Sequence, residues 1–212
     1  KYIAYKTQSV PGFESDRFRV VVYNIQALQS EVLTESFDYT TDDLSWSSDS
    51  KSIYFTANNH GYNPIYKVDV QSKNITKVTD DKAIFGYQVS KDEKTLYAMF
   101  RTVDKPGEIY SYDINGGVYS QTTYFNKKLT EEVDFRPAEQ MWVDGADGVP
   151  VHVFIIKPHG YIEYKKYPLI INVHGGPQMQ WMDSFRGDWQ VYPGSGYVVA
   201  FFNPHGSTGY GS

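Results

Sequence analysis

The stretch YPLIINVHGGP, residues 167–177, decides how the rest of the chain is interpreted. Residues 169–173 are an apolar run of the kind found in strands that are buried on both faces of a sheet. Two consecutive glycines directly after such a strand let the backbone turn sharply and leave N–H groups open to a substrate oxygen. This pattern is typical of an oxyanion-binding loop, although a plain glycine turn before a helix is the alternative. The candidate residues are Gly175 and Gly176, supported by His174 and Pro177.

The segments on either side of this stretch predict a mixed sheet. Residues 138–143 and 151–156 are expected to form a hairpin, and residues 196–202 (GYVVAFF) a further buried strand. Residues 182–192 are expected to form a helix or a helix and loop, which gives a strand-helix-strand unit. A second glycine-rich segment, NPHGSTGYG at residues 203–211, follows the last strand.

The upstream half of the chain contains an internal repeat. The sequence WSSDSKSIYF at Trp46–Phe55 recurs as VSKDEKTLYA at Val89–Ala98, and IYKVD at Ile65–Asp69 recurs as IYSYD at Ile109–Asp113. A partial earlier copy begins at Arg19–Asn24. A period of ~40–50 residues with about four short strands per unit predicts propeller blades, and a β-sandwich with coincidental similarity is the alternative.

Taken together, the motifs resemble the prolyl oligopeptidase family, in particular its acylaminoacyl-peptidase and dipeptidyl-peptidase 5 branch. In that branch a strand ending in H-G-G-P is followed by a G-Y-x-V strand, here Gly196–Val199, and by an N-x-R-G-S-x-G-Y-G loop. Asp147-Gly148 and Lys157-Pro158 resemble the entry into the family's catalytic domain. His205 departs from the pattern because the family has Arg at this position, and an imidazole would bind neighbouring carbonyls or carboxylates more weakly than a guanidinium.

The resemblance implies about three C-terminal blades of a β-propeller at residues 1–137 and the N-terminal part of an α/β-hydrolase domain at residues 138–212. It implies a serine exopeptidase or oligopeptidase that cleaves short peptides by acyl transfer to a serine. The serine nucleophile and its Asp and His partners would lie outside this sequence, so we expect the 212-residue chain alone to be inactive. Candidate substrate-contacting residues are Trp181, Phe185 and Trp189.

Two other functions remain open from the residues. One is a carboxylesterase-type hydrolase, although such enzymes have H-G-G-G and Pro177 argues against it. The other is a non-catalytic propeller binding module with an inert hydrolase-like tail. Ser195 and Ser207 both lack the first glycine of G-x-S-x-G, so both are interpreted as turn serines.

The composition further limits the classes of partner that we expect for this protein. The sequence has no cysteine, no histidine pair with zinc-ligand spacing and no apolar run of membrane-spanning length, so we expect no metal, no cofactor and no membrane partner. The net charge is -5 without a basic stripe, which argues against nucleic acid. The expected partners are a peptide substrate, the remainder of the chain's own propeller and hydrolase domain, and a possible second copy. The compartment stays open between bacterial periplasm and cytoplasm.

Overall fold

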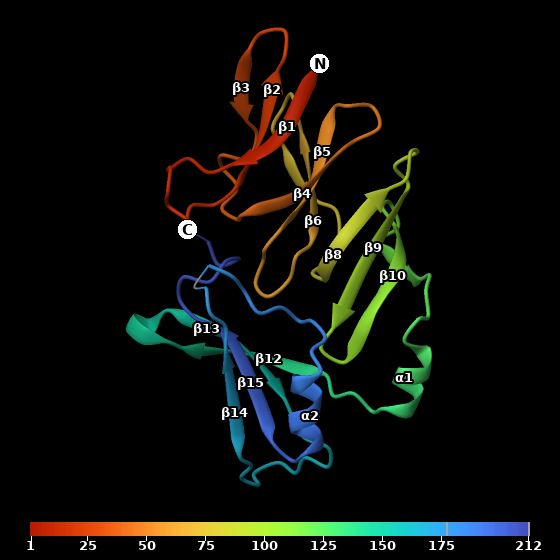
Figure 1. Ribbon diagram of the computed structural model, residues 1–212, viewed down its shortest axis with the longest axis vertical. Coiled ribbons are helices and arrows are strands. Elements are labelled where there is room, and N and C mark those ends of the chain that lie inside the picture. The colour runs from red at the N-terminus through yellow and green to blue at the C-terminus, as the bar shows by residue number, and fades with distance from the viewer. Residues whose placement is uncertain (177, 212) are drawn as a thin grey trace.

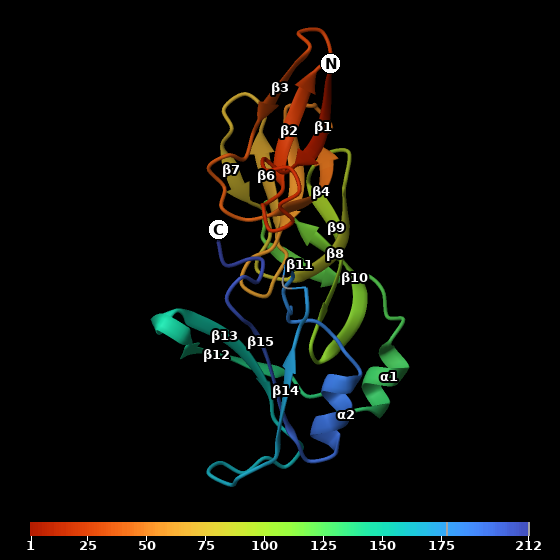
Figure 2. The same cartoon turned by 60° about the vertical axis from the view of Figure 1, so that its left-hand side comes forward.

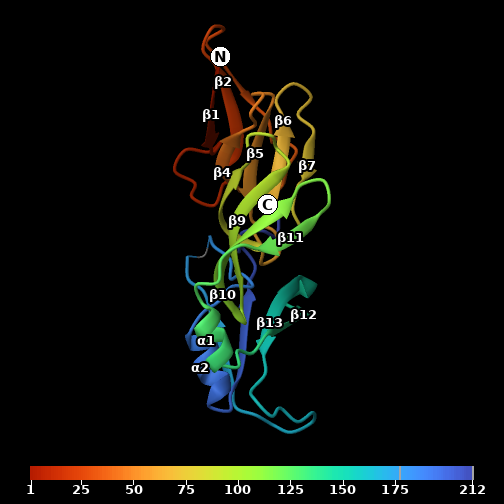
Figure 3. The same ribbon diagram turned by 90° about the vertical axis from the view of Figure 1, so that its right-hand side faces the viewer.

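The computed structural model describes residues 1–176 and 178–211, and these form four β-sheets placed one after another along the molecule (Figure 1). Three sheets are antiparallel and built from strands that are consecutive in sequence, whereas the fourth is mixed. The first sheet lies at one end of the long axis and the fourth at the other (Figures 1 and 3). The C-terminal residues return to the middle of the molecule (Figure 2).

The antiparallel sheets have simple up-and-down strand orders, β1-β2-β3, β4-β5-β6-β7 and β8-β9-β10-β11. The first sheet contains β1 (Tyr2–Thr7), β2 (Arg19–Asn24) and β3 (Gln29–Val32). The second contains β4 (Thr41–Trp46), β5 (Ser52–Ala57), β6 (Ile65–Asp69) and β7 (Ile75–Lys77). The third contains β8 (Ala83–Val89), β9 (Thr95–Thr102), β10 (Lys105–Asp113) and β11 (Val118–Gln121).

The sequence repeat corresponds to repeated hydrogen bonds in the turns before β5 and β9. The Ser47 hydroxyl donates to Asp49 Oδ1 at 2.8 Å, and the same carboxylate oxygen accepts the Lys51 amide at 3.0 Å. The Ser90 hydroxyl donates to Asp92 Oδ1 at 2.6 Å in the equivalent turn. Short polar side chains that bond to nearby backbone groups stabilise tight turns, which is why the motif recurs at the same place in both sheets.

A second hydrogen bond recurs in all three antiparallel sheets. In each, a threonine that follows the outer strand accepts a hydrogen bond from a backbone amide of an inner strand. The bonds run from Val20 to Thr34 at 2.9 Å, from Ile65 to Thr79 at 3.0 Å and from Ile109 to Thr123 at 2.9 Å. The three sheets are therefore copies of one structural unit, which agrees with the predicted repeat.

The second sheet is packed between its two neighbours. All six residues of β5 are buried. Because side chains alternate between the faces of a strand, Ile53 and Phe55 pack with Val20 and Leu33 of the first sheet. Tyr54 points the other way, into a cluster that contains third-sheet residues. This stacking supplies most of the apolar core of the upstream region.

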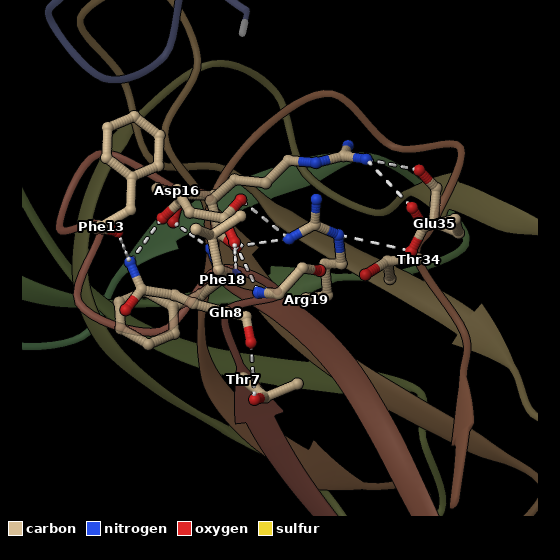
Figure 4. A network of polar contacts seen from close by, with 12 residues as sticks. Thr7, Gln8, Phe13, Asp16, Phe18, Arg19, Thr34 and Glu35 are labelled. Atoms are coloured by element: carbon tan, nitrogen blue, oxygen red, sulfur yellow. Dashed lines mark hydrogen bonds and ion pairs between the residues drawn. The ribbon is translucent and has the colours of Figure 1, made fainter.

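An ionic network closes the loop between β1 and β2 (Figure 4). The Asp16 carboxylate accepts hydrogen bonds from the Ser9 and Val10 amides and from Arg19, whose guanidinium also pairs with Glu35 at 3.3 Å. Burial disfavours the charged carboxylate, but the bonds from Val10, Arg19 and Ser9 outweigh it and lower the pKa of Asp16 to about 2. The network fixes this long loop against the first sheet.

The fourth sheet has the strand order β12-β13-β15-β14 and follows the short helix α1 (Lys127–Glu132). Its elements are β12 (Ala138–Asp144), the 3-10 turn η1 (Ala146–Gly148), β13 (Pro150–Ile156), β14 (Leu169–Val173), α2 (Asp188–Gly194) and β15 (Val198–Asn203). β12 and β13 form the expected hairpin, and β14, α2 and β15 form a strand-helix-strand unit with parallel strands. Trp189 of α2 stacks on Phe201 of β15 with ring centroids 3.8 Å apart.

Two features of this sheet refine the sequence interpretation. Of the helix, or helix and loop, expected at residues 182–192, the structure has a loop followed by a helix from Asp188. In that loop the Asp183 amide donates to the Gly61 carbonyl oxygen, and the Asp183 carboxylate accepts the Val103 amide. The strand β14 was expected to be buried on both faces, yet it is an edge strand. Its alternate residues, Leu169, Ile171 and Val173, are 54%, 57% and 57% exposed.

Candidate active site

The candidate oxyanion loop leaves the carboxyl end of β14. His174 is buried, whereas Gly175 and Gly176 are exposed. Pro177, which the sequence placed in support of this loop, lies outside the described residues. The loop therefore combines an anchored first residue with two accessible glycines.

The two glycines differ in what a side chain would meet. A Cβ atom placed on Gly175 has no atom within 4 Å. Gly176 has a φ of 132°, which side chains rarely allow, and a Cβ there would lie 3.0 Å from the Gln178 amide nitrogen and 3.4 Å from Met179 Cγ. Among the hydrogen bonds between described residues, none is donated by the Gly175 or Gly176 amide. Within the described residues, neither amide has an acceptor in the protein.

His174 joins the candidate loop to the second glycine-rich segment. Its Nδ1 lies 3.0 Å from the Gly175 carbonyl oxygen and its Nε2 lies 3.0 Å from the Ser207 hydroxyl. The Ser207 hydroxyl also lies 2.7 Å from the Pro204 carbonyl oxygen. Ser207 is only 5% exposed, so this Ser–His contact is a structural tie between two loops and not an accessible nucleophile. The separate segments of the motif pair therefore form one unit.

The Asn203 side chain also connects two segments of the site, a role that the sequence analysis did not assign to it. Its side-chain oxygen accepts the Trp181 amide at 2.6 Å, and its side-chain nitrogen donates to the Trp181 carbonyl oxygen at 3.0 Å. The same nitrogen lies 2.9 Å from the Tyr210 hydroxyl. Because both hydrogen-bonding ends of the amide are used, Asn203 holds the segment after the glycines against the end of β15.

The turn between β5 and β6 reaches both glycine-rich segments. The Gly61 amide donates to Gln180 Oε1 at 3.0 Å, Gln180 Nε2 donates to the Tyr62 carbonyl at 2.8 Å, and the His60 amide donates to the Gly209 carbonyl at 3.0 Å. A Cβ on Gly61 would lie 2.6 Å from the Phe154 ring, so only glycine allows this close approach. The second sheet thus positions the candidate site through backbone contacts.

Two histidines from different segments, His60 and His152, both contact Tyr210. His152 lies 3.1 Å from the Tyr210 hydroxyl and 3.1 Å from Gln140 Oε1, and its ring stacks on Trp142. His60 packs edge-on against Tyr210. Burial, assisted by the nearby His60, lowers the pKa of His152 to about 4, so this side chain is neutral at physiological pH.

The other predicted positions have mixed environments. Trp189 is 1% exposed in the core of the fourth sheet. Phe185 packs edge-on against Phe135 at 5.0 Å between centroids. Trp181 is partly buried and lines a cavity together with Trp189. The exposed His205 stands where the family pattern has Arg, and Ser195 bonds to the Val191 carbonyl oxygen as a turn serine.

Metal sites and membrane-spanning helices are the other features considered for the described residues. Within residues 1–176 and 178–211, no three His, Cys, Asp or Glu side chains gather where they could hold a metal ion. In the same part of the chain, no helix has the length and apolarity needed to cross a membrane.

Comparisons with known proteins show which peptidases this chain resembles. No family model matches the chain. The chain is 25% identical over 217 residues to dipeptidyl-peptidase 5 of Schizosaccharomyces pombe, covering 99% of this chain and 31% of that protein. It is 29% identical over 219 residues to dipeptidyl-peptidase 5 of Trichophyton schoenleinii, covering 100% and 30%. The solved structure of Pyrococcus horikoshii acylaminoacyl peptidase superposes with a TM-score of 0.83 at 22% identity, covering 99% and 32%.

The chain resembles serine peptidases of the prolyl oligopeptidase type along 99–100% of its length. Its sequence relatives are dipeptidyl-peptidases 5, and its fold is shared with an acylaminoacyl peptidase. The chain spans about 30% of the length of the curated relatives it matches. The family resemblance drawn from the two glycine-rich segments is therefore confirmed.

Proposed function

We propose that this chain is part of a serine peptidase that hydrolyses peptide bonds of short peptides, with the nucleophilic serine supplied by residues outside the chain. In such a reaction the serine oxygen attacks the substrate carbonyl, and the carbonyl oxygen becomes negatively charged. The amides of Gly175 and Gly176 are the groups of this chain that would donate hydrogen bonds to that oxygen. The printed names of the relatives agree with peptidase activity of this type.

One observation carries the proposal. At the carboxyl end of β14, two exposed glycine amides have no hydrogen-bond acceptor among the described residues, and the loop that bears them is tied down by His174. An oxyanion loop needs this combination, because a fixed donor stabilises developing charge without reorganising during the reaction. A donor of this kind typically contributes ~3–4 kcal/mol to transition-state stabilisation.

The fold supports different roles for the upstream and downstream parts of the chain. The three antiparallel sheets, within residues 1–137, would be consecutive blades of a β-propeller. The mixed sheet, within residues 138–212, would be the first part of an α/β-hydrolase domain, because its parallel strands flank a helix and end in the glycine loop. In this arrangement the propeller borders the site through the 58–62 turn and limits access to small peptides.

The proposal is tested with the full-length protein that contains this chain. Chromogenic dipeptidyl and acyl-aminoacyl substrates are assayed with and without an active-site serine reagent, and a simple ester is the matched control substrate. The proposal expects peptide-bond cleavage that the reagent abolishes. Ester hydrolysis without peptide cleavage would favour the esterase, and no serine-dependent hydrolysis at all would favour a binding module; either result would contradict the proposal.

A further inference from the structure

A small cavity lies between β9 and the segment that follows the candidate oxyanion loop. Its volume is about 140 Å³. The two regions are joined beside it by the bond from the Val103 amide to Asp183 Oδ1 at 2.9 Å. The cavity is lined by Arg101, Met179, Gln180, Trp181, Met182, Ser184, Arg186 and Trp189. Two guanidinium groups, one from each region, therefore face the same space.

Arg101 brings a charge that lacks a counterion. Its Nε is buried without a hydrogen-bond partner, and none of the ion pairs found among the described residues includes it. Its guanidinium lies over the Phe85 ring at 3.9 Å, which fixes its orientation. Burial and, to a smaller extent, the like charge of Arg186 lower the pKa of Arg101. A buried Nε without an acceptor is costly unless an anion satisfies it.

Arg186 is held firmly on the opposite wall. Its Nε and Nη2 donate to the two carboxylate oxygens of Asp188, both at 3.1 Å. Its guanidinium also lies 4.8 Å from the Trp181 ring centroid and 5.2 Å from that of Trp189. Because Asp188 balances Arg186, the pair leaves the charge of Arg101 uncompensated, so the cavity carries a net positive charge.

The cavity is adjacent to the candidate site. Met179, which lines it, is the side chain that a Cβ on Gly176 would meet at 3.4 Å. Trp181, another lining residue, packs edge-on against His174 with ring centroids 6.0 Å apart. A group bound in the cavity would thus lie beside a peptide whose carbonyl oxygen is held by the Gly175 and Gly176 amides.

We propose that Arg101 and Arg186 form a subsite for a carboxylate of the peptide substrate. The planar guanidinium of Arg101 offers paired donors that match a carboxylate, and Arg186 adds favourable charge from the other wall. The carboxylate would be either the C-terminal group of a short peptide or an Asp or Glu side chain. This inference rests on the proposed peptidase function, because it assigns a preference to the same site.

The first experiment measures substrate preference in the full-length protein. Three peptides of one length are compared: one with a free C-terminal carboxylate, its C-terminal amide, and an amidated peptide in which one Gln is replaced by Glu. We expect wild type to prefer at least one carboxylate peptide over the amide by about tenfold in kcat/KM, mainly through KM. The peptide that is preferred identifies the source of the carboxylate.

Variants then assign the preference to the cavity. Arg101→Gln should reduce the carboxylate-over-amide ratio to about one, and Arg101→Lys, which keeps the charge without the fork, should retain part of it. Lys91→Gln removes one positive charge at an exposed position and should leave the ratio unchanged. A ratio of one in wild type, or an unchanged ratio in Arg101→Gln, would overturn the proposal.

A binding measurement separates this proposal from the proposed function. The tryptophan fluorescence of the full-length protein is titrated with N-acetyl-glutamate and N-acetyl-glutamine, because Trp181 and Trp189 contact Arg186. Saturable binding of the glutamate compound alone, lost in Arg101→Gln, would support the subsite even if no peptidase activity were found. Equal responses to both compounds, together with a lower Tm of Arg101→Gln, would mean that Arg101 pairs with an acidic residue of the protein, and the subsite would be rejected.

Discussion

The strands β5 and β14 have similar apolar sequences but contrasting environments. β5 (SIYFTA) is buried at all six positions, because the first and third sheets cover its two faces. β14 (LIINV) is an edge strand whose alternate residues are more than half exposed. An apolar run therefore indicates that a strand can be buried, whereas the neighbouring elements decide whether it is.

The largest expected effect of this contrast is on stability. Phe55→Ala in β5 should lower the free energy of unfolding by about 3–5 kcal/mol, since the ring is fully buried between two sheets. Ile171→Ala in β14 should cost less than about 1 kcal/mol in this chain. Urea unfolding of the 212-residue chain, followed by circular dichroism, gives both values. Equal losses would mean that β14 is as well covered in solution as β5.

A smaller effect on the free energy of unfolding is expected when the pH changes the charge of a histidine at the junction of the second and fourth sheets. His152 is 3% exposed, and its pKa is lowered from 6.5 to about 4 in the folded protein. Between these values the unfolded chain binds a proton that the folded chain does not, so stability rises with pH across this window. The contribution is fully present above pH 6.5 and is lost as pH falls towards 4, by about 3 kcal/mol.

The pH effect is checked by measuring unfolding free energies from pH 4 to 7. His152→Gln should flatten the profile in this window, while His205→Gln, which changes an exposed histidine, should leave its slope unchanged. A slope that persists in His152→Gln would assign the pH dependence to another group.

The smallest expected effect concerns the repeated threonines. Thr79→Val should cost about 1–2 kcal/mol, because it leaves the buried Ile65 amide without its acceptor. Thr34→Val should cost a similar amount, as its hydroxyl accepts the Val20 amide in the same way. Thr76→Val, at an exposed position, is the matched control and should change stability little. A control as destabilised as the two repeat variants would argue against equivalent units.

Much of the fold follows from local patterns in the sequence. The Ser47 and Ser90 turns and the strands after them were predictable, because each turn is stabilised by side chains within a few residues. The hairpin β12–β13 and the glycine loop were also predictable, since hydrophobic pattern and turn residues mark them directly. These features need only neighbouring residues to form.

The contacts around the candidate site were less accessible to sequence reasoning. Gln180 belongs to no motif, and the motif that contains Asn203 does not indicate its partner, yet each satisfies backbone groups of another segment. The point at which the loop gives way to α2 was not predictable, because it depends on the hydrogen bonds of Asp183 to Gly61 and Val103. Such long-range contacts override local helix preference and leave no periodic signal in the sequence.

The central claim is that the glycine amides after β14 stabilise negative charge on a substrate oxygen. It is tested most directly by comparing Gly176→Ala with Gly175→Ala in the full-length protein, by measuring kcat on a chromogenic peptide substrate. We predict a loss of about 10²–10³-fold for Gly176→Ala, because its φ of 132° and its neighbours do not accommodate a side chain, and a much smaller loss for Gly175→Ala, whose Cβ enters open space. A correctly folded Gly176→Ala enzyme with wild-type kcat would contradict the claim.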